Sequence, residues 1–152
     1  SRVERTGEPL SAFIADIDLF KLVNDHHGHD AGDRLLVRFV EVMAAQLRPT
    51  DVLTRYGGEE FVVLLPSASL ADAVAIAERI RTALRGEIVP PLREPITASF
   101  GAAELQAQED SAALLARIDE ALYRAKESGR DRVVTSPTEA TPDGSVRADT
   151  PA

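Results

Sequence analysis

The sequence predicts an α+β domain built on a mixed, mainly antiparallel sheet with helices packed on it. Three observations lead to this fold class. Short apolar runs and segments with helically spaced apolar residues follow one another in the order β-α-α-β-β-α-β-α-β. Glycines and prolines separate these segments. The length of 152 residues is enough to bury one core without disulfides or metal staples.

The first half of the chain begins with a strand, Leu10–Ile17, which is an apolar run that ends in acids. A short mixed segment, Leu19–Asn24, comes next, and a polar loop is predicted at His26–Asp30. Over residues 31–47 apolar side chains recur at helical spacing, so one face of this helix belongs to the core. Pro49 stops the helix.

A hairpin follows, with RYGGEEF over residues 55–61 at its tip. Both central residues of a type I′ turn need φ > 0, which favours Gly57 and Gly58 as those residues. The second strand, Phe61–Leu65, is apolar without alternation, so we expect it to be covered on both faces.

In the second half of the chain, glycines and prolines again separate the predicted elements. Its predicted elements are a helix over 70–84 closed by Gly86, an irregular crossover with Pro90, Pro91 and Pro95, a strand over 96–103, a helix over 114–125 ended by Gly129, and a strand over 132–135. Residues 1–135 are expected to form the domain. Residues 136–152 are poor in large apolar side chains and are expected to be a disordered tail.

The composition excludes several classes of protein. The chain has no cysteine, so disulfides, thiolate catalysis and zinc-thiolate sites are excluded. No run of about 18 apolar residues exists to span a membrane. A formal net charge of −8 argues against a general nucleic-acid surface, although local cations and metal ions would still let such a protein bind a polyphosphate.

Four carboxylates stand at the ends of predicted strands: Asp16 and Asp18 after the first strand, and Glu59 and Glu60 at the hairpin tip. They meet in space only if the two strands are neighbours. In that case they form an all-oxygen site of the kind that Mg²⁺ prefers, completed by a backbone carbonyl and substrate phosphates. Otherwise they are solvated loop charges.

Further polar residues also have two interpretations each. Lys126 and Arg130, four apart near the end of the last helix, are spaced to grip a terminal phosphate or simply to complement the helix dipole. Asn24 and Asp33 suit a purine edge, but also a turn and an early helical position. The histidines at 26, 27 and 29 lack the spacing of a helical metal pair and are interpreted as a polar loop.

Taken together, several motifs closely resemble the GGDEF domain of diguanylate cyclases, with GGEEF as the form of the signature. They run in order from about Leu10 to Val134. The motifs are DIDLFK at 16–21, ND at 24–25, GH at 28–29, GD at 32–33, RYGGEEF at 55–61, SFG at 99–101, ALYRAK at 121–126 and GR at 129–130.

This resemblance implies a palm-like nucleotidyl cyclase fold with a five-stranded sheet, and condensation of two GTP into cyclic di-GMP and two pyrophosphates. It implies Mg²⁺ or Mn²⁺, two ions per active half-site. The residues carried over are Asp16 and Glu59 as catalytic metal ligands with Ile17 and Glu60 beside them, and Phe20, Lys21, Asn24, Asp33, Gly57, Gly58, Lys126 and Arg130 as GTP-binding residues.

The resemblance also gives Arg48-Pro-Thr-Asp51 a meaning. As a bare pattern it is a turn-stabilising ion pair, but family members carry an Arg-x-x-Asp site there for inhibition by the product, and Arg79 is added to it from the next helix. Each domain would hold one GTP, so catalysis needs a two-fold homodimer. A sensor domain in the full-length protein and a cytoplasmic location are implied as well. No nucleic acid or membrane contact is expected.

Two points depart from the family pattern or compete with it. The Asp-x-Leu-Thr-x-Leu-x-Asn-Arg segment that usually precedes the first strand is not seen in Ser1–Pro9. A domain that binds GTP or cyclic di-GMP without chemistry is the alternative function, and a metal-dependent phosphohydrolase is a third.

Overall fold

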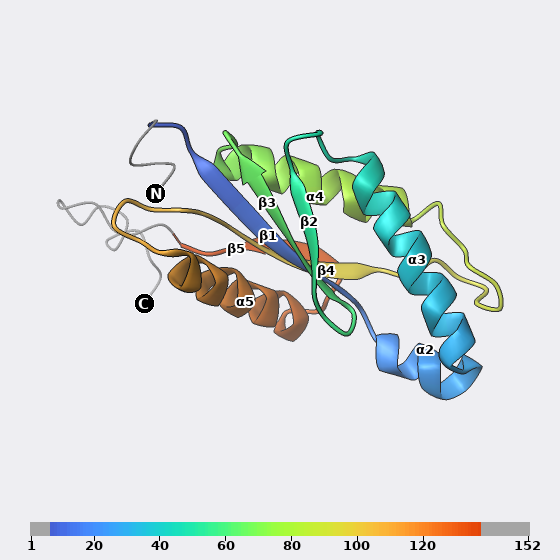
Figure 1. The fold of residues 1–152 in the computed structure, drawn as a ribbon. Helices are drawn as coiled ribbons and strands as arrows, with labels where there is room; N and C mark the ends of the chain where they lie inside the picture. Colours follow the sequence, from blue (N-terminus) through green and yellow to red (C-terminus); the bar gives the residue numbers. More distant parts are fainter. Residues whose placement is uncertain (1–6, 138–152) are drawn as a thin grey trace.

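The protein is described here by a computed structural model that covers residues 7–137 and is built on one five-stranded sheet (Figure 1). The strands are β1 (Leu10–Ile17), β2 (Val52–Gly57), β3 (Glu60–Pro66), β4 (Ala98–Glu104) and β5 (Arg132–Thr135), in the order β2-β3-β1-β4-β5. All neighbouring pairs are antiparallel except β4 and β5. The predicted fold class, with a mixed and mainly antiparallel sheet, is confirmed.

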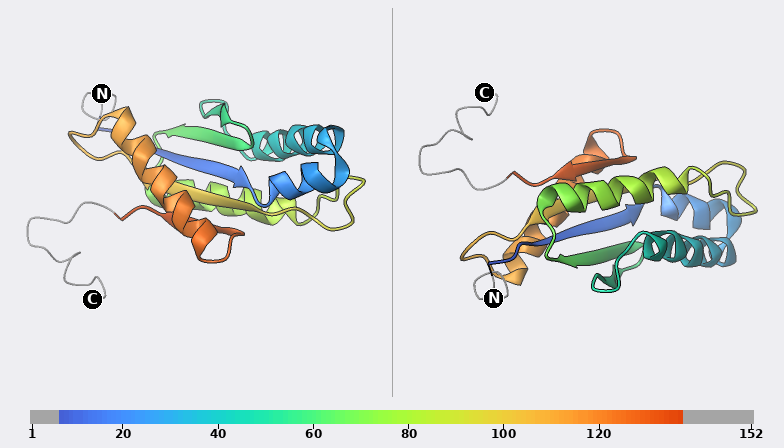
Figure 2. Two further views of the ribbon diagram at one scale, coloured as in Figure 1. Left: turned by 90° about the horizontal axis from the view of Figure 1, so that it is seen from below. Right: turned by 90° about the horizontal axis from the view of Figure 1, so that it is seen from above.

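Four helices complete the fold: α2 (Phe20–His27), α3 (His29–Ala45), α4 (Leu70–Leu84) and α5 (Ser111–Glu127). Helix α4 begins with a capping box, in which Ser69 and Asp72 each accept from the other's backbone amide. Asp110 caps α5 by accepting from the Ala113 amide. Figure 2 views the molecule from below, with α5 in front, and from above, with α4 in front, so the two helices lie on opposite faces of the sheet.

The central strand β1 has buried residues on both of its faces. Phe13, Ala15 and Ile17 belong to the core that α3 and α4 cover. Ala12 and Ile14 belong to a smaller core under α5. Because side chains alternate along a strand, Asp16 lies on the α5 face, at the end of β1.

The predicted polar loop at His26–Asp30 is wrong. Helix α2 continues to His27 and α3 begins at His29, so Gly28 alone joins them. Its φ of 89° is a conformation that glycine adopts without steric cost, and one such residue is enough to end a helix and redirect the chain. Helix α3 correspondingly starts earlier than predicted and ends at Ala45, well before Pro49.

The predicted turn at the hairpin tip is displaced by one residue. Gly57 pairs with Glu60, so the turn residues are Gly58 and Glu59, and of the two glycines only Gly58 has a positive φ, at 45°. The reason is a register shift between Arg55 and Gly57, where an extra residue enters β2.

The expectation that β3 is covered on both faces is also wrong at one position. Leu64 is 36% exposed, because α5 lies over only part of its face of the sheet. A groove of about 550 Å³ remains beside α5, lined by Leu10, Thr54, Tyr56, Val62, Leu64, Leu105, Glu109, Asp110, Ser111, Leu114 and Leu115. We call this the α5 groove.

The other boundaries differ little from those predicted. Strand β4 begins at Ala98, helix α5 is longer at both ends, and α4 and β5 have the predicted bounds. Ser136, the first residue of the predicted tail, is buried, and its amide donates to the Ala102 carbonyl at 2.8 Å. Residues 138–152 of that tail lie outside the described residues. No helix in the described range is long and apolar enough to cross a bilayer.

Candidate active site

The candidate site is centred on Asp16 at the end of the central strand. Asp16 lies opposite Glu60 of β3 and Ser99 of β4, since β1 has a neighbour on each side. The condition for the predicted acidic site, that the first strand and the hairpin are neighbours, is therefore met. The Asp16 carboxylate is almost fully buried, and its Oδ1 has no hydrogen-bond partner among residues 7–137.

Lys126, near the end of α5, provides the positive charge at this site. Its ammonium donates to Asp16 Oδ2 and lies 4.0 Å from Glu60 Oε2. Burial raises the pKa of Asp16 from 3.8 to about 7, although the hydrogen bond and charge of Lys126 act to lower it. Burial acts to lower the pKa of Lys126, but the hydrogen bond to Asp16 and the neighbouring carboxylates outweigh it and raise that pKa.

Glu59 reaches the same site from the turn of the hairpin. The negative charges of Glu59 and Glu60 both act to raise the pKa of Asp16. The turn itself is held by Arg55, whose guanidinium donates twice to the Gly58 carbonyl, at 2.9 and 2.5 Å. A Cβ built on Gly57 or Gly58 would meet no other atom within 4 Å, so the protein leaves open space beside both.

Asp18 does not join the other three acids. It accepts hydrogen bonds from the hydroxyls of Thr97 and Ser99, at 2.6 and 2.7 Å, and from the Asp131 amide at 3.0 Å. Both of its oxygens are thus engaged by the protein. The predicted group of four carboxylates is corrected to three, and no cluster of three His, Asp or Glu side chains placed to bind a metal by itself occurs in residues 7–137.

The two predicted guanine-binding residues come from adjacent helices. Asn24 of α2 packs against Gly32 of α3, where a Cβ would lie 1.9 Å from Asn24 Oδ1 and 3.1 Å from the Phe20 ring. This Oδ1 is buried and unpartnered within the described part of the chain. Asp33 follows Gly32 and is exposed. Lys21 is exposed as well, whereas Phe20 is buried in the core.

Lys126 and Arg130 do not share a helical face, which corrects the spacing argument for them. Helix α5 ends at Glu127, and Arg130 lies in the following turn with a φ of 63°. Its amide donates to the Ala125 carbonyl at 2.9 Å. In the range 7–137 its guanidinium has no hydrogen-bond or ion-pair partner and stays exposed.

The predicted product site lies between the end of α3 and the start of β2. Arg48 forms a salt bridge to Asp51 at 2.7 Å and donates to the Pro66 carbonyl at 2.9 Å. These hydrogen bonds hold the turn, as the simple ion-pair interpretation expects. Arg79 of α4 reaches the same region of α3, where its Nε donates to Gln46 Oε1 at 3.2 Å.

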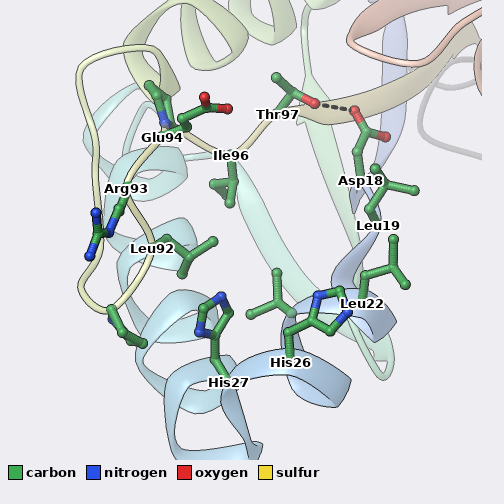
Figure 3. Close-up of a pocket in the computed structure, with 13 residues that line it drawn as sticks. Asp18, Leu19, Leu22, His26, His27, Leu92, Arg93, Glu94, Ile96 and Thr97 are labelled. Carbon is green, nitrogen blue, oxygen red and sulfur yellow. Dashed lines mark hydrogen bonds between the residues drawn. The ribbon is translucent and has the colours of Figure 1, made fainter.

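A separate cleft of about 510 Å³ lies between α2 and the segment 91–97 (Figure 3). Its walls include Leu19, Leu22, His26, His27 and Leu92, together with Asp18 at one end. Apart from Asp18, none of the predicted site residues lines it. The two histidine rings stand nearly perpendicular, with centroids 6.4 Å apart, and form no metal cluster.

Sequence reasoning missed the partners of Asp18. Thr97 and Asp131 carry no motif of their own, and Ser99 was noted only as part of SFG. The available signal was the second acid of DID, whose side chain had to find donors if the strand end was buried.

The family of the chain follows from comparison with known proteins. Residues 1–132 match the model of the family described as "Diguanylate cyclase, GGDEF domain". The chain belongs to this family. Its fold is accordingly that of GGDEF cyclase domains, and its GGEEF signature is shared with a solved relative.

Three relatives illustrate the likeness. The response regulator PleD of Caulobacter vibrioides is 47% identical over 133 residues, which are 84% of this chain and 29% of PleD. The active GGEEF domain of a diguanylate cyclase from Vibrio cholerae is 34% identical, with a TM-score of 0.85 over 91% of this chain and 89% of that one. The GGDEF domain of DgcB from Caulobacter crescentus, solved with cyclic di-GMP, is 30% identical, with a TM-score of 0.85 over 90% and 83% of the two chains. The chain thus spans less than a third of PleD.

Proposed function

We propose that this domain condenses two GTP molecules into cyclic di-GMP and releases two pyrophosphates. The observation that carries the proposal is the buried Asp16 carboxylate, which has one unpartnered oxygen and lies beside the GGEEF hairpin and Lys126. A buried charge without full compensation is costly, and it is found where a ligand supplies the missing partner.

The donor set fits a hard divalent cation, Mg²⁺ or Mn²⁺. Asp16, Glu59 and the carbonyl of Ile17 would hold it, with Glu60 beside them. All of these are oxygen donors, and the unpartnered Asp16 Oδ1 needs a positive partner. Two ions per half-site would be completed by substrate phosphates, which agrees with there being too few protein carboxylates for a closed cage in residues 7–137. Bound metal supplies charge for the transferred phosphate and lowers the pKa of the attacking hydroxyl.

Different side chains would bind different parts of the nucleotide. Asn24 and Asp33 would bind the guanine edge, and Phe20 and Lys21 would approach the phosphates. The open backbone at Gly57 and Gly58 would let the nucleotide come close. Lys126, which neutralises Asp16 in this structure, would contact the γ-phosphate together with Arg130 once metal takes over that task.

The reaction would need two domains. Each would bind one GTP, and the 3′-hydroxyl of one nucleotide would attack the α-phosphate of the other across a two-fold homodimer. Glu59 would help to remove the proton of that hydroxyl. We place the reaction in the cytoplasm, where GTP is available, with a sensor domain elsewhere in the full-length protein controlling dimerisation.

The product would return to a second site. Arg48, Asp51 and Arg79 are proposed to bind cyclic di-GMP and slow the enzyme. The support is positional: Arg48 is 43% exposed, and Arg79 approaches the same region of α3.

The test is incubation of the domain with GTP and Mg²⁺, followed by chromatography of the nucleotides. A version fused to a dimeric coiled coil removes dependence on spontaneous dimerisation. Cyclic di-GMP is expected. GDP with phosphate would indicate a hydrolase instead, and unchanged GTP from the fused dimer would indicate a receptor domain; either result overturns the proposal.

Glu59→Gln keeps the size of the side chain and removes its charge. We expect it to fold and to lose turnover by about 100-fold or more, since it loses both a metal ligand and a proton acceptor. The matched control is Glu127→Gln at the exposed end of α5, which should turn over like the unsubstituted domain. Full activity of Glu59→Gln would remove Glu59 from the mechanism.

A further inference from the structure

The turn after α5 has an unusual backbone. Gly129, Arg130 and Asp131 have φ values of 125°, 63° and 48°, so two successive non-glycine residues are left-handed. A left-handed conformation is unfavourable for residues with a Cβ and persists only where the surroundings enforce it. This turn carries Arg130, so the contacts that enforce it also decide where Arg130 lies.

The first support comes from the end of the central strand. Asp18 is buried, and its Oδ2 accepts from both the Asp131 amide and the Thr97 hydroxyl, the latter bond drawn in Figure 3. The Ser99 hydroxyl fixes the other carboxylate oxygen, and the Asp18 amide donates to the Thr97 carbonyl at 2.9 Å. Asp18 is therefore held by Ser99 of β4 and by Thr97 just before that strand, and it in turn holds the amide of Asp131.

The second support comes from α4. Arg81 Nη1 donates to the Asp131 carboxylate at 3.1 Å and to its carbonyl at 3.4 Å. Glu78, one turn earlier on α4, orients Arg81 by accepting from its Nε at 2.6 Å. The Arg81 side chain is only 19% exposed, so this ion pair is partly shielded from water. Asp131 is thus fixed at its amide, carbonyl and carboxylate.

These contacts tie the turn to the active site, because Asp18 is two residues from Asp16. Arg130 immediately precedes the clamped Asp131, and its own guanidinium is without a protein partner in residues 7–137. We propose that Asp18 and Arg81 are positioning residues: they hold the Arg130–Asp131 turn so that Arg130 meets the terminal phosphate of GTP. Neither residue touches the nucleotide. This inference rests on the proposed function.

The test compares two nucleotides that differ by the γ-phosphate. Calorimetry in Mg²⁺ would measure the affinity for GDP and for a non-reacting methylene analogue of GTP. Arg81→Gln is expected to weaken the triphosphate analogue about tenfold, the loss of one well-placed charged contact, and to leave GDP unchanged. Asp131→Ala, which removes the other side of the ion pair, should produce the same selective loss. Arg85→Gln is the matched control, because Arg85 caps the end of α4, is exposed, and has no side-chain hydrogen bond or ion pair within residues 7–137.

A double substitution separates positioning from general destabilisation. In an Arg130→Ala background, Arg81→Gln should cause no further loss of triphosphate affinity. Equal losses for GDP and the triphosphate, or losses that add to those of Arg130→Ala, would overturn the inference alone. Failure of the unsubstituted domain to bind the triphosphate would overturn the proposed function, and this inference with it.

Discussion

The surroundings of Asp16 and the Arg48–Asp51 turn both contain a charged pair, but they treat polar atoms differently. At the candidate active site, Asp16 Oδ1 and Asn24 Oδ1 are buried and unpartnered within residues 7–137. In the Arg48–Asp51 turn, the guanidinium is bonded to both a carboxylate and a backbone carbonyl. The first region therefore lacks partners that a ligand can supply, whereas a ligand at the second must compete with bonds already made.

Among substitutions in the two regions, Asp16→Asn should have the largest effect. We expect about a 100-fold or greater loss of turnover, measured as the rate of cyclic di-GMP formation, because the proposed metal ligand loses its charge. The Asp119→Asn control, on the exposed face of α5, should retain full activity. Turnover near that of the unsubstituted domain would remove Asp16 from the metal site.

The same substitution should also change how the stability of the metal-free domain depends on pH. Burial raises the pKa of Asp16 from 3.8 to about 7, so the metal-free folded state binds a proton that the unfolded state has lost. Stability should consequently fall as pH rises from about 4 to about 7, and Asp16→Asn should flatten that decline. Urea unfolding across this range in EDTA provides the measurement.

Arg48→Ala tests the Arg48–Asp51 turn, where the guanidinium already has protein partners. The affinity for cyclic di-GMP should fall by about tenfold or more, because the proposed product site loses a charged hydrogen-bond donor. Calorimetry measures this affinity. The Arg48 side chain is 43% exposed but that of Asp51 is buried, so its carboxylate loses a charged partner and stability should fall by about 1–3 kcal/mol. Arg85→Ala serves as the control. Unchanged product affinity would reduce the turn to a structural feature.

Gly32→Ala tests whether the position of Asn24 matters for nucleotide binding. The new methyl group would occupy the place of Asn24 Oδ1, and the side chain must rotate away. Helix propensity favours alanine by about 1 kcal/mol, which offsets part of the strain. We expect a small change in melting temperature but a several-fold weaker affinity for GTP. The control is Gly86→Ala, whose Cβ would meet only the Ala83 carbonyl at an ordinary 3.7 Å. Equal GTP affinity in both variants would exclude Asn24 from the site.

The smallest effect is expected at Glu109, which belongs to neither region. Arg117 donates to both of its oxygens, at 2.7 and 2.8 Å, and lowers the pKa of Glu109. Glu109→Gln should cost about 1 kcal/mol at pH 7. Because the folded-state pKa is the lower one, this difference should be present above about pH 4.5 and disappear as pH falls through the folded-state value. Glu120→Gln, in a more exposed pair with Arg124, should change stability by less than about 0.5 kcal/mol.

The sequence predicted the strands and helices well because their apolar periodicity reflects which face is buried. It could not predict that Gly28 alone joins two helices, since the neighbouring histidines are polar and look like a loop. The extra residue in β2 was also hidden, because a bulge depends on how two strands pair rather than on either strand alone.

At the candidate site, too, the sequence predicted some features and missed others. Asp16, Glu59 and Lys126 were all named from motifs, and the structure brings them together. Asp18 was grouped with them because it is near in sequence, yet its partners lie in β4, just before it and before β5. Helical spacing misjudged Arg130 because α5 ends before it. Such contacts are set by tertiary structure.

The α5 groove has a consequence for how the domain behaves at high concentration. Its apolar lining is in contact with water, which favours association between molecules. The chain's formal charge of −8 opposes such encounters at long range. Since salt shortens the range of that repulsion to about 10 Å at 0.1 M, the colloidal stability of the domain should decline as ionic strength rises.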